Sequence, residues 1–124
     1  MKTVHTDKAP AAVGPYSQAK ICGNLVFLSG QIAIDPKTNT IKAQTIEEHT
    51  EQICKNIIEV LKAAGTSIEN VVKTTCFLAE MSDFAAFNEV YAKYFVSSPA
   101  RSCVAAKALP KGVLAEIEVI AEIV

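Results

Sequence analysis

The sequence lacks the paired cysteines and histidines that most metal sites and redox centres use. Its four cysteines are widely spaced, with no C-x-x-C motif and no paired histidines: Cys22, Cys54, Cys76 and Cys103. Zinc ligands and redox dithiols normally come in close pairs, so this spacing argues against both kinds of site and predicts no bound metal. We expect four free thiols in a reducing compartment.

A block of basic residues and a long apolar run are also missing. Twelve Lys and Arg residues oppose thirteen Asp and Glu residues, for a formal net charge of −1. Because no basic patch would follow a phosphate backbone, we expect no nucleic-acid partner. No stretch approaches a membrane span, and residues 1–7 carry no apolar segment typical of a secretory signal. These features predict a cytoplasmic protein without membrane contact.

What the sequence has in excess is apolar surface. Its 124 residues have the length of one domain, spanning 1–124, and 50% of them are hydrophobic. The mean hydropathy is +0.25, which is high for a small monomer. A single small core cannot hide that much apolar surface, so the composition favours an oligomer.

Two apolar runs near the N-terminus flank a two-residue turn. Residues 16–22 and 25–34 surround a Gly-Asn pair, which is a strong signal for a β-hairpin. Pairing outward from that turn places Ser29 opposite Gln18, Gly30 opposite Ser17, and Gln31 opposite Tyr16. The hairpin therefore predicts that a tyrosine, a serine and a glycine meet at its open end.

The middle of the chain predicts a long helix. Thr45 and Glu48 form a capping box, and an apolar stripe continues through residues 45–64. Gly65 follows directly and suits the left-handed residue at a helix C-terminus.

A strand and a second helix follow. Residues 71–79 are rich in β-branched side chains and predict a strand. Ser82 or Asp83 caps a helix that runs to about residue 95, with aromatic residues on its buried face. Asn88 is the polar exception on this helix. Taken alone, it is an ordinary solvated residue.

The last two predicted strands carry a single arginine and a row of glutamates. Residues 114–123 alternate strictly between apolar residues and a face that contains Glu116. Pro and Gly separate them from residues 99–109, so we predict an antiparallel hairpin in which Arg101 opposes Glu122. Taken alone, this is a solvated cross-strand ion pair worth about 0.2–1 kcal/mol.

Strands separated by helices predict two β-α-β crossovers added to these hairpins. The fold class is therefore α+β, a mixed β-sheet with two helices on one face. The other face keeps apolar residues and would be bare in a monomer. We expect partner copies to cover it in a ring-shaped homo-oligomer.

Seven segments, which together span nearly the whole chain, match one known pattern: residues 11–18, 28–31, 72–77, 83–88, 99–104, 109–110 and 117–119. Together these segments resemble the motifs of the reactive-intermediate (RidA-like, YjgF-type) imine and enamine deaminases. This resemblance implies a chorismate-mutase-like fold and a homotrimer with ligand clefts between subunits. It also implies hydrolysis of 2-iminobutanoate or 2-iminopropanoate to the 2-oxo acid and ammonia, without a cofactor.

The resemblance also implies roles for individual residues. Arg101 would grip the substrate carboxylate with a two-pronged hydrogen bond, beside the backbone N–H of Cys103. Glu116 would hold and activate the attacking water. The remaining positions that match the lining of the family's cleft are Tyr16, Ser29, Gly30 and Asn88.

The predicted hairpin makes the distance between the two charged residues informative. Its register separates Arg101 from Glu116 by about six strand steps, on the order of 20 Å. The two residues then cannot share a ligand within one subunit. We therefore expect Arg101 of one chain to meet Glu116 of its neighbour.

A non-catalytic function stays open as the alternative. A trimeric module could bind small carboxylates or regulate metabolism, and family members carry labels such as translation-initiation inhibitor, ribonuclease and purine regulator. Glu116 favours the enzyme, because a second anion beside an anionic ligand costs affinity. Residues 96–98 form a shorter loop than in many family members, which leaves the preferred ligand size open.

Overall fold

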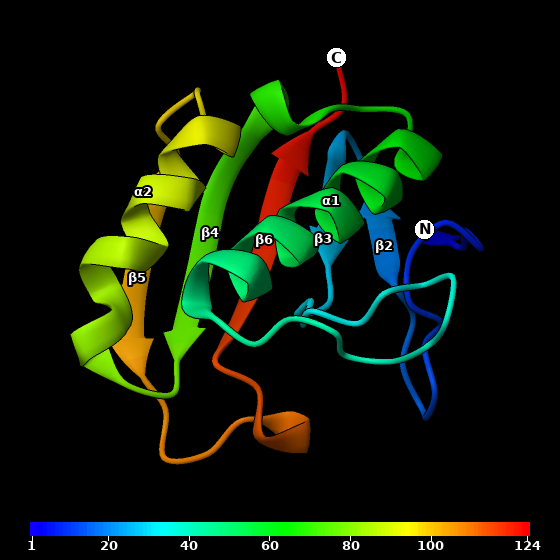
Figure 1. Ribbon diagram of the computed structural model, residues 1–124. Helices are drawn as coiled ribbons and strands as arrows, with labels where there is room; N and C mark the ends of the chain where they lie inside the picture. The colour runs from blue at the N-terminus through cyan, green and yellow to red at the C-terminus, as the bar shows by residue number, and fades with distance from the viewer.

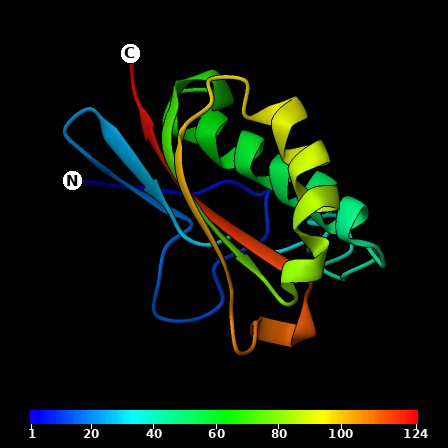
Figure 2. The same cartoon turned by 90° about the vertical axis from the view of Figure 1, so that its left-hand side faces the viewer.

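The computed structural model describes residues 1–124 and confirms the α+β fold. A six-stranded sheet has the order β1-β2-β3-β6-β4-β5, and two helices cover one of its faces (Figures 1 and 2). The strands are β1 Lys2–Val4, β2 Ala19–Cys22, β3 Leu25–Leu28, β4 Val71–Leu78, β5 Ala100–Ala105 and β6 Ala115–Glu122; the helices are α1 Ile46–Ala64 and α2 Phe84–Tyr94. No helix is both long enough and apolar enough to cross a membrane.

The first hairpin has the predicted register over its four paired positions. Ala19 pairs with Leu28 at one end of β2–β3, and Cys22 pairs with Leu25 beside the turn. The pairing stops sooner than predicted, because Gln31 forms a bridge with Ile117 of β6 and does not lie opposite Tyr16. This change of partner carries the segment after β3 onto the neighbouring strand.

Helix α1 follows the capping signals closely. The Thr45 side chain accepts a hydrogen bond from the Glu48 backbone N–H, and the Glu48 carboxylate accepts one from Thr45. Gly65 ends the helix with φ 87°, and its N–H reaches the carbonyls of the last turn. The apolar stripe packs onto the sheet and is buried at Ile53 and Ile57.

The predicted C-terminal hairpin is wrong. β4 lies between β5 and β6 (Figure 1), pairing parallel with β5 and antiparallel with β6. Arg101 therefore lies opposite Thr74 of β4 and does not oppose Glu122, which pairs with Leu25 of β3. The strand-helix-strand connection through α2 places β5 in parallel beside β4, as a crossover requires.

Burial explains why β6 takes the inner position. Every second residue of β6, from Ala115 to Ala121, is buried, and β3 and β4 supply a neighbour on each side. No residue of β5 is fully buried, which is typical of an edge strand. A short turn at Pro110–Gly112 lets the chain pass the end of β4 between these positions.

The two faces of the sheet differ sharply. The face under α1 and α2 holds a continuous core that includes Val26, Cys76 and Ile117. The opposite face has no covering element in this chain (Figure 2), and Phe27 on it is 42% exposed beside its strand partner Ile120. This open face also carries Glu116, in register with Phe77 of β4.

Candidate ligand site

Arg101 lies beneath helix α2, and side chains of that helix contact its guanidinium group. Its Nη1 donates a hydrogen bond of 2.7 Å to Oδ1 of Asn88. Its Cζ lies 4.8 Å from the centroid of the Tyr91 ring and 5.5 Å from that of Phe84. Asn88 is therefore half-buried against a cation and is not a freely solvated residue.

No acid of the chain neutralises this guanidinium. The ion pairs are His5–Asp7, Lys42–Asp35 and Lys62–Glu59, and none of them includes Arg101. A guanidinium carries five N–H donors, and Asn88 uses one of them. The rest remain to bind an acid with two parallel hydrogen bonds, which is the preferred geometry for a carboxylate.

Cys103 follows Arg101 on the same face of β5 and lies in register with Cys76 of β4. It is half-buried, and burial raises the pKa of its thiol more than the nearby Arg101 lowers it. A raised pKa keeps the sulfur protonated near neutral pH, so the side chain is poorly suited to act as a nucleophile.

The second group of site residues lies on the open face. Ser29 donates a hydrogen bond of 2.6 Å from its hydroxyl to the carbonyl oxygen of Ser17. The bridge between Gln31 and Ile117 then brings Gly30 against Glu116. A Cβ atom at Gly30 would overlap Oε2 of Glu116 and lie 2.8 Å from its Cδ, so only glycine leaves the carboxylate in this place.

The carboxyl group of Glu116 is half-buried with no hydrogen-bond donor from its own chain. Burial raises its pKa above the ordinary glutamate value, and the negative charge of Glu118 raises it further. A carboxyl group with a raised pKa is a better proton acceptor once ionised, which suits it to activate a water molecule.

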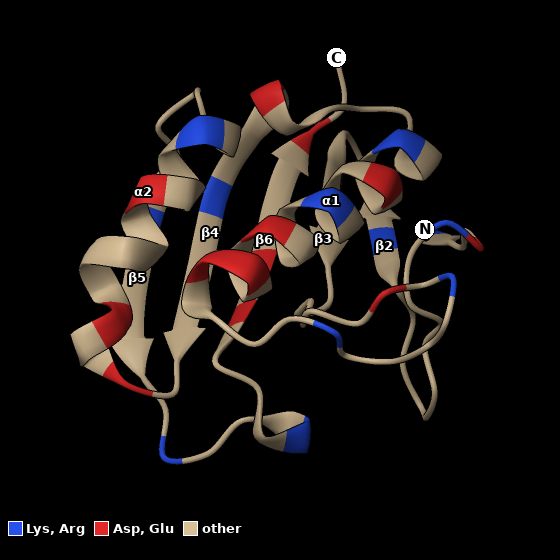
Figure 3. Cartoon of the chain, in the orientation of Figure 1, with Lys and Arg blue, Asp and Glu red and all other residues tan.

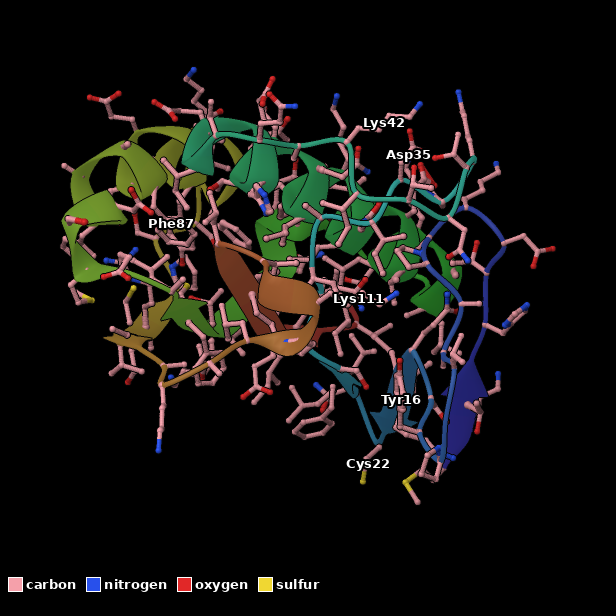
Figure 4. The ribbon with its side chains drawn as sticks, turned by 60° about the horizontal axis from the view of Figure 1, so that its bottom comes forward. Tyr16, Cys22, Asp35, Lys42, Phe87 and Lys111 are labelled. Atoms are coloured by element: carbon pink, nitrogen blue, oxygen red, sulfur yellow. The ribbon has the colours of Figure 1, made fainter.

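Tyr16 belongs to the Glu116 side of the molecule. It is 55% exposed and lines, with Ser29 and Phe27, a hollow of about 380 Å³. Figure 4 shows Tyr16 beside β2 and β3, far from Phe87 of α2. Phe87 immediately precedes Asn88 in the chain, so Tyr16 and the residues around Arg101 occupy separate regions.

The sheet itself separates the two groups. Arg101 shares the helix face with its buried strand partner Thr74, whereas Glu116 shares the open face with Phe77. The distance expected from the hairpin register was wrong, since that hairpin does not exist. Opposite faces of one sheet nevertheless keep the two side chains from meeting within a single chain.

The aromatic support of Arg101 was not predicted from the sequence, because the aromatic face of α2 has the spacing of a core-facing stripe. The spacing of Phe84, Asn88 and Tyr91 places all three on one helix face, and that spacing was visible in the sequence. The sequence did not reveal that β5, which carries Arg101, lies under this face of α2.

Basic and acidic residues are interspersed over the chain (Figure 3), without a basic stripe. No group of three or more His, Cys, Asp or Glu side chains is arranged to hold a metal ion.

Comparison with known proteins finds close relatives over nearly the full chain. A family model described as Endoribonuclease L-PSP matches residues 6–123. AldR of Lactococcus lactis, named as a candidate regulator, is 50% identical over 99% of this chain and 98% of its own length. The 2-iminobutanoate/2-iminopropanoate deaminase of Mus musculus is 47% identical over 97% of this chain and 90% of its own. The crystal structure of a candidate endoribonuclease from Thermotoga maritima has a TM-score of 0.96 at 50% identity, covering 98% of this chain and 97% of that one.

Proposed function

Because the chain belongs to the endoribonuclease L-PSP family, which includes RidA-like deaminases, we propose that it hydrolyses short 2-imino acids. Its substrates are 2-iminobutanoate and 2-iminopropanoate, and its products are the 2-oxo acids and ammonia. The observation that carries this proposal is Arg101, a half-buried cation with aromatic and amide support and no acidic partner in its own chain.

Arg101 binds the substrate carboxylate in this mechanism. Two charge-assisted hydrogen bonds fix the plane of the acid, and the backbone N–H of Cys103 adds a third donor. Fixing one end of a small molecule also fixes the direction of its C=N bond. Imines react readily with water, so orientation supplies much of the required rate enhancement.

Glu116 acts on the attacking water. Its carboxylate accepts a proton as the water oxygen bonds to the imine carbon and passes this proton to the nitrogen, which gives a carbinolamine. The remaining hydroxyl proton is then transferred to the nitrogen by the same carboxylate as the C=O bond forms and the C–N bond breaks, so that the nitrogen leaves as ammonia. Tyr16 and Ser29 orient the nitrogen end of the substrate, and Gly30 leaves room for the carboxylate beside it.

The site is proposed to form between copies of the chain. Arg101 and Glu116 lie on opposite faces of one sheet, so a shared ligand needs Arg101 of one copy and Glu116 of the next. The open face offers Phe27 and Ile120 as apolar contact area for such a neighbour. A homotrimer with three equivalent clefts satisfies both requirements.

The test generates 2-iminobutanoate in place with a threonine dehydratase and follows its decay. We expect the wild-type protein to accelerate decay, and Arg101→Ala to lower kcat/KM by about 10²- to 10³-fold through loss of the charged contact. Arg101→Lys keeps the charge and should recover part of the rate. Unchanged decay with the wild-type protein would reject the deaminase function.

A regulatory function is the second candidate, supported by the 50% identity to AldR. A regulator would bind a small carboxylate through Arg101 without converting it. Glu116→Gln separates the two functions, because it should tighten anion binding in a regulator but abolish turnover in an enzyme.

A further inference from the structure

The Tyr91 side chain links the guanidinium of Arg101, on β5, to the neighbouring strand β4. Its hydroxyl oxygen lies 2.7 Å from Oγ1 of Thr74, in a hydrogen bond that is buried from solvent. Thr74 is the strand partner of Arg101, so one position of the sheet carries both the anchored ring and the cation. The Tyr91 ring also stacks on Phe95 at 4.3 Å between centroids.

We propose that Tyr91 and Phe84 are positioning residues that fix the plane of the Arg101 guanidinium, with Thr74 holding the Tyr91 ring. This inference rests on the proposed function only in taking Arg101 as the carboxylate anchor. The Cζ atom of Arg101 lies over both rings, and Asn88 accepts a hydrogen bond from one guanidinium N–H. A planar acid is left to approach along the remaining edge, where two parallel hydrogen bonds form.

Fixing the guanidinium matters because an arginine side chain has many rotamers. Holding it in place before the ligand arrives lowers the entropy lost on binding, and this gain applies equally to substrate and transition state. Loss of such uniform binding raises KM and leaves kcat unchanged. A residue that only stabilised the fold would not show this pattern.

The first experiment measures the order of Arg101 without any ligand. Nuclear magnetic resonance relaxation of its side-chain Nε–H should give an order parameter near that of rigid backbone, about 0.85, in the wild-type protein. We expect it to fall below about 0.6 in Tyr91→Leu. A mobile guanidinium in the wild-type protein, or an equally rigid one in Tyr91→Leu, would overturn the proposal.

The second experiment measures function in the same variants. Tyr91→Leu and Phe84→Leu should each raise KM for 2-iminobutanoate, and the Kd of added 2-oxobutanoate, by roughly 2- to 30-fold, with kcat within about twofold. In an Arg101→Ala background, Tyr91→Leu should have no further effect on either constant. An equal loss in that background would show a purely structural role.

Milder variants keep the test usable if Tyr91→Leu does not fold. Tyr91→Phe and Thr74→Val each remove one partner of the buried hydrogen bond, and each should raise the Kd of 2-oxobutanoate by a few-fold. Tyr94→Phe is the matched control on the same helix, since Tyr94 donates to Glu51 and not toward Arg101. It should leave Kd unchanged.

The two proposals fail in different ways. If the wild-type protein binds 2-oxobutanoate but does not hydrolyse the imine, the deaminase function fails, and the dependence of Kd on Tyr91 still decides this inference. If it binds neither compound, the order of the Arg101 side chain alone decides it.

Discussion

The two halves of the proposed site differ in how completely one chain builds them. The half around Arg101 is nearly complete within one chain, because Arg101 donates a hydrogen bond to Asn88 and lies over two aromatic rings. The half around Glu116 is unfinished, because its half-buried carboxyl group has no hydrogen-bond donor and lies against Gly30. Around Arg101, guanidinium N–H donors remain without a partner, whereas around Glu116 a carboxyl group remains without a donor.

In the proposed oligomer, a second copy would supply what the region around Glu116 lacks. A half-buried carboxylate without donors is costly, and the same burial raises the pKa of Glu116. A cleft formed with another chain would hold a water molecule at Glu116 as the missing hydrogen-bond donor. The incomplete half thus lies where an oligomer would complete the chemistry.

Mixing two inactive variants gives the strongest test of whether Arg101 and Glu116 from different copies form one cleft. Arg101→Ala and Glu116→Gln should each lose nearly all activity, but oligomers assembled from equal amounts of both should regain it. In a closed ring, about a quarter of the clefts combine an intact Arg101 from one copy with an intact Glu116 from the next. Activity near that fraction, in the dehydratase-coupled assay, is the expected outcome.

The control for this experiment is each variant unfolded and reassembled alone, which should stay inactive. Native mass spectrometry of differently tagged chains establishes that mixed oligomers have formed. If mixed oligomers form and remain inactive, the two residues do not serve the same cleft from different copies.

Adding a methyl group at Gly30 should disturb only the region around Glu116. Gly30→Ala forces the Glu116 carboxylate to move, since the new Cβ would overlap its oxygen. Displacing a reacting group by about 1 Å can cost about 10²-fold in rate, so kcat should fall by that order. The obstacle is the flexible end of a side chain, and we expect the melting temperature to change little.

A double variant shows whether this loss passes through Glu116. In a Glu116→Gln background, Gly30→Ala should cause little further loss of kcat, because the group that it displaces no longer accepts a proton. Additive losses would mean that Gly30 acts through another part of the cleft, such as the neighbouring Ser29.

The N-terminal hairpin and the helices were predicted better from the sequence than the two C-terminal strands were. Local signals were sufficient for α1, where Thr45 and Glu48 cap one end and Gly65 the other, and for the four-pair register of the first hairpin. These features depend on residues a few positions apart. Helix α2 begins directly after Asp83, one of the two predicted N-cap positions, but the Asp83 side chain makes no capping hydrogen bond.

The C-terminal strands were predicted wrongly because their pairing is not local. Neighbours in sequence usually pair, and the Pro-Gly turn between 99–109 and 114–123 supported a hairpin. The structure instead inserts β4, since the continuous buried face of β6 needs a strand on both sides. The aromatic rings around Arg101 could be foreseen only once β5 was known to lie beneath α2.

The raised pKa of Glu116 predicts a specific pH dependence. Glu116 must be ionised to accept a proton, so kcat/KM should fall as the pH drops through a pKa above the ordinary glutamate value. Stability has the opposite sign: a raised pKa means that the folded state binds this proton more tightly, so ionisation at higher pH destabilises the fold. Glu116→Gln should therefore raise the melting temperature at pH 7 and not at pH 4.

Equal melting-temperature changes at both pH values would show that the effect of Glu116→Gln does not come from ionisation. Glu118→Gln provides the matched control on the same strand. It removes the second cause of the raised pKa, so the acidic limb of the kcat/KM profile should move to lower pH.

The smallest effect on kcat/KM is expected from substituting Cys103, which lies in the region around Arg101. Burial raises the pKa of its thiol, and the proposed contact uses its backbone N–H, which a substitution retains. Cys103→Ser should change kcat/KM by less than about threefold, comparable to the loss of one weak hydrogen bond. Cys22→Ser, at an exposed cysteine, is the matched control. A loss of activity on the scale of Arg101→Ala, with a substrate adduct on the sulfur seen by mass spectrometry, would instead make the thiol the reacting group and leave Arg101 as its partner.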